Sequence, residues 1–163
     1  MSHTVTVRTA TVTTSTSSIL INTGFMKTYR GILKVLEFIL GIICVGIMGY
    51  LFDYSVAVSP GSLFFFLMIT TFMIGTFILV LSSLFSISSE AMISKTLYEV
   101  LYHAVAFGLL LAASINFMML VNDERRGVTR NYNLHVAAGS MSLVNTVLYL
   151  LSTIFGIRSY KGL

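Results

Sequence analysis

The chain has 163 residues, of which 56% are hydrophobic and only 10% are charged, and its mean hydropathy is +0.90. Water-soluble domains are nearer half apolar and a quarter charged, so this composition cannot supply a polar surface in water. The net charge of +4 comes from basic residues beside apolar segments, which suits anionic lipid and not nucleic acid. A soluble globular domain is therefore excluded, and an integral membrane protein is predicted.

Residues 1–27 differ from the rest of the chain because they are rich in Thr, Ser and Val. They contain no apolar core long enough for a signal peptide, so the first apolar window is expected to act as an uncleaved insertion signal. The Thr/Val alternation would also fit a strand, but one isolated strand has nothing to pair with. We therefore expect 1–27 to form a flexible cytoplasmic tail.

Four apolar windows follow the tail, and each is long enough to cross a bilayer. A hydrocarbon core about 30 Å thick needs about 20 helical residues. Backbone groups in hydrocarbon must be satisfied within their own segment, and the windows lack the alternation of barrel strands, so helices are predicted. The windows are roughly Gly31–Phe52, Gly61–Phe85, Thr96–Val121 and Leu134–Ile157.

The connections between these windows are short. Residues 53–60, 86–95 and 122–133 join the four predicted helices in turn, and none is large enough to fold as a domain. Short connections place consecutive helices side by side and antiparallel. The predicted fold is therefore one all-α membrane domain over residues 28–161, a four-helix up-down bundle.

Lys and Arg residues are distributed unevenly between the two sides of this bundle. Seven basic residues fall on the side of the termini and three on the other side. The positive-inside rule therefore predicts that both termini are cytoplasmic. The seven are Arg8, Lys27, Arg30, Lys34, Lys95, Arg158 and Lys161, and the three are Arg125, Arg126 and Arg130.

The chain has a single cysteine, Cys44, which excludes several classes of membrane protein. It cannot form a disulfide within the chain, and the chain has no Trp. Claudin-like proteins, tetraspanins and membrane thiol oxidoreductases all require a cysteine pair. Cys44 lies deep in the first window and is interpreted as a small packing residue.

Three ionisable residues lie inside the predicted spans and form a candidate site. Glu37 lies about six residues, or about 9 Å, above the start of the first span. Glu99 and His103 reach a similar depth in the third span, and their spacing of four residues places them on one helix face. We predict an intramembrane polar layer in which Glu37 faces the bundle and reaches His103 if the first and third helices touch. Lys34 and Lys95 are expected to lie beside it as snorkelling neighbours.

Two interpretations of this polar layer remain open. It would fix helix packing or contact lipid, or it would serve a small proton or ion channel or transporter subunit. A transport path needs polar steps through the whole membrane. Above the layer the first helix offers only glycines and Cys44, and the second helix contains no ionisable residue. The structural or lipid-contact role of Glu37, Glu99 and His103 is therefore favoured.

Small and hydroxyl residues on one face of a predicted helix indicate where helices pack closely, and Ser or Asn can hydrogen-bond across such a contact. The fourth helix carries the clearest stripe of this kind. Gly108 and Ala112 lie on the opposite face of the third helix and form a candidate self-association surface. The predicted packing residues are Gly41, Gly108, Ala112, Ala138, Ser142, Asn145, Tyr149 and Ser152.

The sequence contains no recognisable catalytic set, such as HExxH, a Ser-His-Asp arrangement or a glycine-rich phosphate loop. Glu99 and His103 alone cannot complete a metal site, which needs three or four ligands. We therefore predict that the chain is not an enzyme and uses no cofactor or metal. An accessory subunit of a larger membrane enzyme is a third class that the sequence leaves open.

Two segments resemble the MARVEL family. The segment RGILKVLEFILGIICVGIMGY is similar to the basic foot and first helix of a MARVEL domain, with an acidic residue at Glu37. The segment HVAAGSMSLVNTVLYLLSTIFGIRSYK is similar to its fourth helix, with Tyr149 and a basic exit. The resemblance covers about residues 27–161, and the chain length points to the MAL, plasmolipin and chemokine-like-factor branch. Insect members of similar size act in myoblast fusion and junction formation.

The resemblance implies a non-enzymatic protein of cholesterol- or sphingolipid-rich membrane domains, or lipid rafts. Such proteins lie in the plasma membrane or in trafficking vesicles and act in vesicle trafficking, membrane apposition or fusion, or cell–cell junctions. The expected partners are membrane lipids, other membrane proteins or a second copy of the chain, and no nucleic acid.

Overall fold

The chain forms four long α-helices in the computed structural model, which describes residues 27–53, 59–85, 97–124 and 131–161. Each helix is long and apolar enough to cross a membrane by length and composition. The predicted all-α architecture with four spans is therefore confirmed. The helices are α1 (Tyr29–Asp53), α2 (Pro60–Phe85), α4 (Leu97–Glu124) and α5 (Tyr132–Tyr160).

Some sequence-based predictions concern residues outside the described ranges. These are the flexible tail up to residue 26, Lys95 beside the polar layer, and the basic residues of the connection at 125–130. Within the described ranges, the helices are mostly longer than the apolar windows, and α5 continues past Ile157 to Tyr160. The reason is that apolar windows locate the hydrocarbon core, whereas a helix can continue into the headgroup region.

Side-chain caps fix where α1 and α2 begin. The backbone N–H of Gly31 donates to Thr28 Oγ1 at 3.1 Å, and that of Ser62 donates to Ser59 Oγ at 3.2 Å. Hydroxyl oxygens at this position satisfy backbone donors that have no partner in the first turn. Pro60 is the first residue of α2, where its missing N–H removes no helical hydrogen bond.

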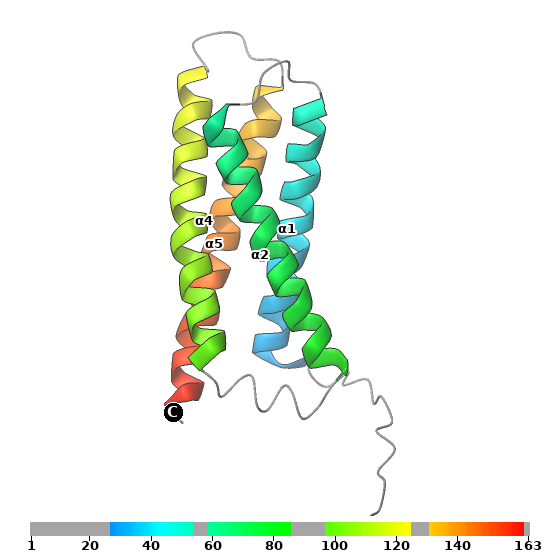
Figure 1. Ribbon diagram of the computed structural model, residues 1–163, viewed down its shortest axis with the longest axis vertical. Helices are drawn as coiled ribbons and strands as arrows, with labels where there is room; N and C mark the ends of the chain where they lie inside the picture. Colours follow the sequence, from blue (N-terminus) through cyan, green and yellow to red (C-terminus); the bar gives the residue numbers. More distant parts are fainter. Residues whose placement is uncertain (1–26, 54–58, 86–96, 125–130, 162–163) are drawn as a thin grey trace, which may run out of the picture.

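The four helices form a closed ring in which each helix packs on the next one along the chain and α1 packs on α5 (Figure 1). Consecutive helices are antiparallel, as expected from the short connections. We call the end where α1 begins and α5 ends the terminus side, and the opposite end the far side. The helices α1 and α4 occupy diagonal corners of the ring, so the first and third helices are not close neighbours along their lengths.

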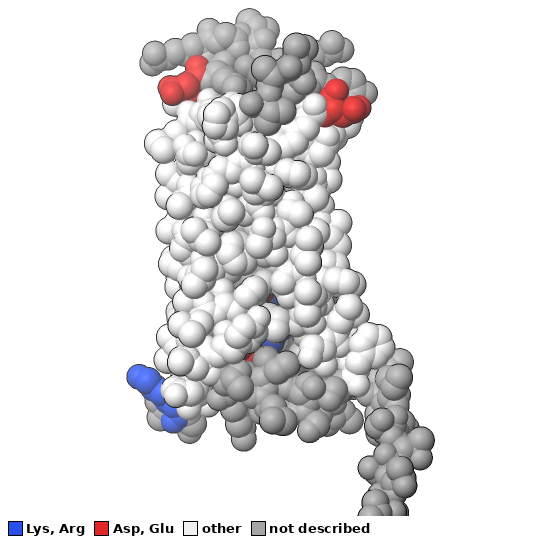
Figure 2. Space-filling model, in the orientation of Figure 1, with Lys and Arg blue, Asp and Glu red and all other residues white. Residues whose placement is uncertain are grey.

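The outer surface of the bundle suits lipid. Figure 2 shows charged atoms at the two ends and in one narrow gap of an otherwise uncharged face. Among the described residues, the exposed charged side chains all lie at helix ends. They are Lys27, Arg158 and Lys161 on the terminus side, and Asp53 and Asp123 on the far side.

Exposed tyrosines mark the two edges of this apolar surface. Tyr29, Tyr98 and Tyr160 are exposed at the terminus side, and Tyr50 is exposed near the far side. Tyrosine is enriched at membrane–water interfaces, where its ring meets apolar chains and its hydroxyl meets headgroups. The distribution of these residues therefore fits a bundle that crosses a bilayer from one interface to the other.

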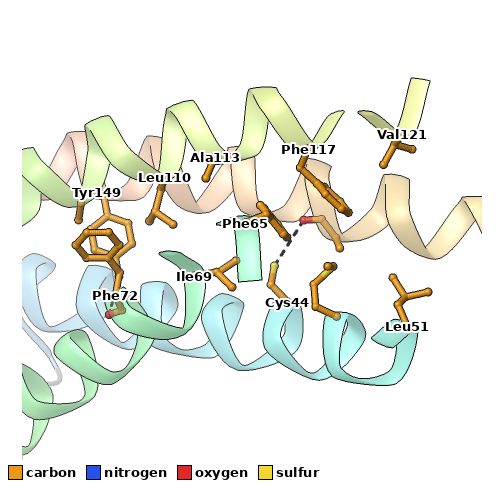
Figure 3. Close-up of a cluster of buried hydrophobic side chains, with 13 residues drawn as sticks. Cys44, Leu51, Phe65, Ile69, Phe72, Leu110, Ala113, Phe117, Val121 and Tyr149 are labelled. Carbon is orange, nitrogen blue, oxygen red and sulfur yellow. Dashed lines mark hydrogen bonds between the residues drawn. The ribbon is translucent and has the colours of Figure 1, made fainter. Parts of the chain in front are cut away.

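The far-side half of the bundle is filled by an apolar core. Phe65 of α2 and Phe117 of α4 are fully buried and stack with ring centroids 4.3 Å apart. Figure 3 shows side chains of this core from Phe72, near the middle of the bundle, to Val121 near its far end. Apolar packing therefore dominates the interior of this half among the described residues.

The close approach of α1 and α2 depends on Gly41. A Cβ atom at Gly41 would lie 3.0 Å from Met73 Cβ, whereas a Cβ at Gly46 on the same helix would meet nothing within 4 Å. We predict that Gly41→Leu destabilises the bundle by about 1–3 kcal/mol, because a buried side chain is added where there is no room.

The measurement is thermal unfolding of the full chain in lipid nanodiscs. Gly46→Leu is the matched control, since it makes the same substitution on the lipid-facing side of α1, and it should unfold near the wild-type temperature. Equal unfolding temperatures for the two variants would show that Gly41 is not needed for close packing.

Candidate functional site

Four ionisable side chains are buried together in the terminus-side half of the bundle. Lys34 and Glu37 come from α1, and Glu99 and His103 come from α4. Their exposed fractions are 3%, 0%, 4% and 0%. Burying a charge in an apolar medium is costly unless it is paired and hydrogen-bonded. We call these four side chains the polar cluster. The contacts among them determine how much of the cost of their burial is offset.

Lys34 and Glu99 form a close ion pair. The distance between Lys34 Nζ and Glu99 Oε1 is 2.6 Å, and both side chains are almost completely buried. The expectation that Lys34 snorkels towards the headgroups is wrong, because its ammonium group points into the bundle. The reason is that the carboxylate of Glu99 on the diagonal helix offers it an opposite charge, which the lipid-facing side does not.

Glu37 is fully buried and connects α1 to two other helices. Ser152 of α5 donates a hydrogen bond to Glu37 Oε1 at 2.5 Å, and His103 Nε2 lies 3.7 Å from Glu37 Oε2. Asn145 Nδ2 also donates to the backbone carbonyl of Glu37 at 3.3 Å. Glu37 therefore faces the centre of the bundle, and its side chain reaches α4 across the diagonal.

His103 is held in one orientation by its own helix. Its Nδ1 atom lies 2.7 Å from the backbone carbonyl of Glu99, one helical turn earlier. A carbonyl oxygen can only accept, so Nδ1 carries the hydrogen and donates it. This contact turns Nε2 towards Glu37.

A group of hydroxyls brings α2 into contact with the polar cluster. Thr76 Oγ1 lies 2.7 Å from Tyr149 OH and 3.0 Å from Tyr102 OH. Both tyrosines also donate to the backbone carbonyl of Phe72, at 3.2 Å and 2.9 Å. The Tyr102 ring meets the His103 ring edge-on at a centroid distance of 5.1 Å. Sequence reasoning missed Thr76 and Tyr102, although a Tyr next to His103 and a Thr in an apolar helix were available signals.

The predicted packing residues divide into an inner and an outer set. Gly108 and Ala112 are exposed on the outer face of α4. The inner set is buried, and Ser142 Oγ lies 2.7 Å from Ser114 Oγ across the α4–α5 contact. Cys44 is fully buried with its Sγ 3.7 Å from the carbonyl of Ala138, which fits a packing role. The buried residues are Gly41, Ala138, Ser142, Asn145, Tyr149 and Ser152.

The arrangement does not form a metal site or a continuous polar path within the part of the chain that the structure describes. No group of three His, Cys, Asp or Glu side chains there could hold a metal ion. Beyond the polar cluster, the bundle axis is occupied by the apolar core around Phe65 and Phe117. The geometry therefore supports a role for the polar cluster in connecting helices.

Comparison with known families accounts for this architecture. The sequence matches the MARVEL family, described as a membrane-associating domain, over residues 25–155. The chain belongs to the MARVEL family. The matched region of this MARVEL domain contains α1, α2 and α4, most of α5, and every residue of the polar cluster. No curated protein and no solved structure matches the chain.

The ion pair between Lys34 and Glu99 can be tested by removing its members singly and together. Lys34→Met leaves the Glu99 carboxylate without its counter-charge in an apolar interior, and Glu99→Gln does the same to Lys34. Breaking a buried pair in this way costs about 3–5 kcal/mol. We expect the double variant to recover most of this loss, because neither charge then remains unpaired.

The measurement is a double-mutant cycle by thermal unfolding of the full chain in nanodiscs. Lys161→Met is the control, since Lys161 is an exposed basic residue at the end of α5, and its effect should stay within about 0.5 kcal/mol. Strictly additive losses in the double variant would contradict coupling between the two side chains.

Proposed function

We propose that this MARVEL protein organises membrane domains through lateral contacts with lipids and with other membrane helices, and that it does so without catalysis. The processes we propose are vesicle trafficking, membrane apposition or fusion, and cell–cell junction formation, at the plasma membrane or in trafficking vesicles. The observation that carries this proposal is the distribution of polarity. The charged and histidine side chains deep in the spans are buried, and the exposed surface between the helix ends is uncharged and mostly apolar among the described residues.

Short far-side connections support lateral recognition. In the sequence, α1 and α2 are separated by residues 54–59, and α4 and α5 by residues 125–131. Segments of this length offer little surface for a soluble ligand. The extensive surface that the protein presents is its lipid-facing side, so recognition within the bilayer is favoured. Cholesterol and sphingolipid are the lipid partners that we propose.

The outer face of α4 is the surface that we propose for helix contacts. A Cβ atom at Gly108 would meet nothing within 4 Å, and Ala112 lies one turn further along the same exposed face. Small residues let two helices approach until their backbones touch, which increases packing where the hydrophobic effect contributes little. This face therefore suits a second copy of the chain or a helix of another membrane protein.

A small channel or transporter subunit is the alternative function for the same residues. Glu37, Glu99 and His103 would supply the polar steps on the terminus side. The stacked rings of Phe65 and Phe117 occupy the bundle axis on the far side. A path that ends at an apolar core does not conduct, so the geometry favours the organising role.

The distribution of charge supports cytoplasmic termini. Lys27, Arg158 and Lys161 are exposed on the terminus side, whereas Asp53 and Asp123 are exposed on the far side. Basic residues are retained on the cytoplasmic side of a membrane and are attracted to its anionic lipids.

Cysteine labelling in intact cells tests this orientation. The single native cysteine, Cys44, is fully buried and should give no background. We expect Asp123→Cys to react with an impermeant maleimide from outside, and Lys161→Cys to react only after the cells are permeabilised. The reverse labelling pattern would show that the termini are outside.

Lateral association can be measured by counting labelled chains in liposomes with and without cholesterol. We expect wild-type chains to associate with each other or with cholesterol-rich domains, and Gly108→Leu to reduce association, because the larger side chain holds helices apart. Gly46→Leu is the matched control, since Gly46 is also exposed with open space around it. Neither association nor cholesterol dependence in the wild type would refute the proposed function.

A further inference from the structure

We propose that Glu37 and His103 together bind a single proton inside the membrane, and that loss of this proton loosens the terminus-side half of the bundle. This inference does not depend on the proposed organising function. It is carried by two facing buried atoms that have no hydrogen-bond partner among the described residues, and by the charges around them. The ligand is a proton, and the binding atoms are Glu37 Oε2 and His103 Nε2.

The hydrogen-bond partners of the pair leave one position for the proton. His103 Nδ1 donates to the carbonyl of Glu99, so its hydrogen is already in use. Glu37 Oε1 accepts from Ser152. The remaining atoms, Glu37 Oε2 and His103 Nε2, face each other at 3.7 Å, and neither has a hydrogen-bond partner among the described residues.

Without a proton between them, these two atoms would present lone pairs to each other in a fully buried site. The carboxylate of Glu37 would also carry a charge with no counter-charge, which is unfavourable in an apolar interior. A proton on either atom supplies a donor and an acceptor. It leaves an imidazolium beside a carboxylate or an imidazole beside a carboxylic acid, and in either form the pair has no net charge.

The other ionisable groups near the pair add no net charge, so the protonation of Glu37 and His103 determines the net charge of the polar cluster. On α1 and α4, Lys34 and Glu99 neutralise each other at 2.6 Å. The rings of Tyr102 of α4 and Tyr149 of α5 lie beside the His103 ring, and their hydroxyls are bonded to Thr76 and to the Phe72 carbonyl. The sequence of α2 contains no ionisable side chain. The polar cluster is therefore neutral with one proton on the pair, negative with none and positive with two.

Access to the pair is from one side. Lys34 and Glu99 retain 3% and 4% exposure, whereas Glu37 and His103 have none. Figure 2 shows acidic and basic atoms in the narrow gap near the terminus side. The apolar core blocks the axis on the far side (Figure 3). Protons therefore exchange with the terminus side alone, so the pair senses the pH of one compartment and does not conduct between two.

Loss of the proton acts on the helices because the pair spans the diagonal. The backbones of α1 and α4 are not adjacent, so in the terminus-side half the side chains of the polar cluster join the two helices. A net negative charge at this point favours entry of water. Water that separates Glu37 from His103 would weaken packing around Ser152 and Asn145, which bind Glu37 from α5.

The protonation state of His103 can be observed directly. The chain has three histidines, so ring ¹⁵N spectra of the full-length protein in nanodiscs are simple. The His103→Gln variant assigns the resonance. We expect Nδ1 to stay protonated while a single titration step affects the Glu37–His103 pair, and Glu37→Gln to move or remove that step. An unprotonated Nδ1, or a titration unaffected by Glu37→Gln, would overturn the proposal.

Stability as a function of pH provides a second test. Where the folded pair holds one proton more than the unfolded chain, each rise of one pH unit should increase the unfolding equilibrium constant about tenfold. The sign follows because protons bound only by the folded state stabilise it less as they become scarce. The variant with both Glu37→Gln and His103→Gln carries no charge at the pair and should lose this dependence.

His135→Gln is the matched control, since His135 lies at the far side near the start of α5, and it should keep the wild-type pH profile. Equal pH profiles for the wild type and the double variant would overturn the proposal. Reconstituted liposomes provide the remaining measurement. We expect no proton flux through the wild type. A flux that Glu37→Gln abolishes would overturn one-sided proton binding and show that the protein conducts protons.

Discussion

Contacts between buried ionisable side chains across the centre of the bundle are the constraint on which the rest of the structure depends. Within a bilayer the hydrophobic effect does little to hold helices together, because lipid tails are as apolar as the side chains. Directional contacts must therefore select one packing arrangement. The Lys34–Glu99 ion pair and the Glu37–His103 contact join the diagonal helices α1 and α4. Each contact requires a particular rotation of its helix, so together they orient both helices.

The polar cluster also explains the contrast between the two halves of the bundle. On the terminus side, Ser152 and Asn145 of α5 donate hydrogen bonds to Glu37, and Thr76 of α2 contacts the hydroxyls of Tyr102 and Tyr149. On the far side, aromatic stacking and aliphatic packing fill the axis. Hydrogen bonds and ion pairs thus dominate the terminus-side half, whereas close packing dominates the far-side half, where Ser114 and Ser142 add one buried hydrogen bond between α4 and α5. A change of charge in the polar half can loosen that half while the apolar half remains packed.

The chain belongs to the MARVEL family and has a mostly apolar outer surface, and both observations indicate that the protein is surrounded by lipid. Because the polar cluster is buried, its contacts are with other helices of the bundle and not with the surroundings. This separation connects the proposed lateral role with the proton-binding pair. The outer faces would make the contacts, and the polar cluster would set how firmly those faces are held.

The sequence by itself determined the number of spans, their approximate limits and the shared depth of Glu37, Glu99 and His103. These features are local, since they follow from apolar length and from a rise of about 1.5 Å per residue. The tertiary structure alone decided that α1 and α4 are diagonal, that Lys34 points inwards, and that Thr76 contacts the hydroxyls of Tyr102 and Tyr149. The direction of each side chain depends on what the neighbouring helix presents to it, and no spacing within one helix contains that information.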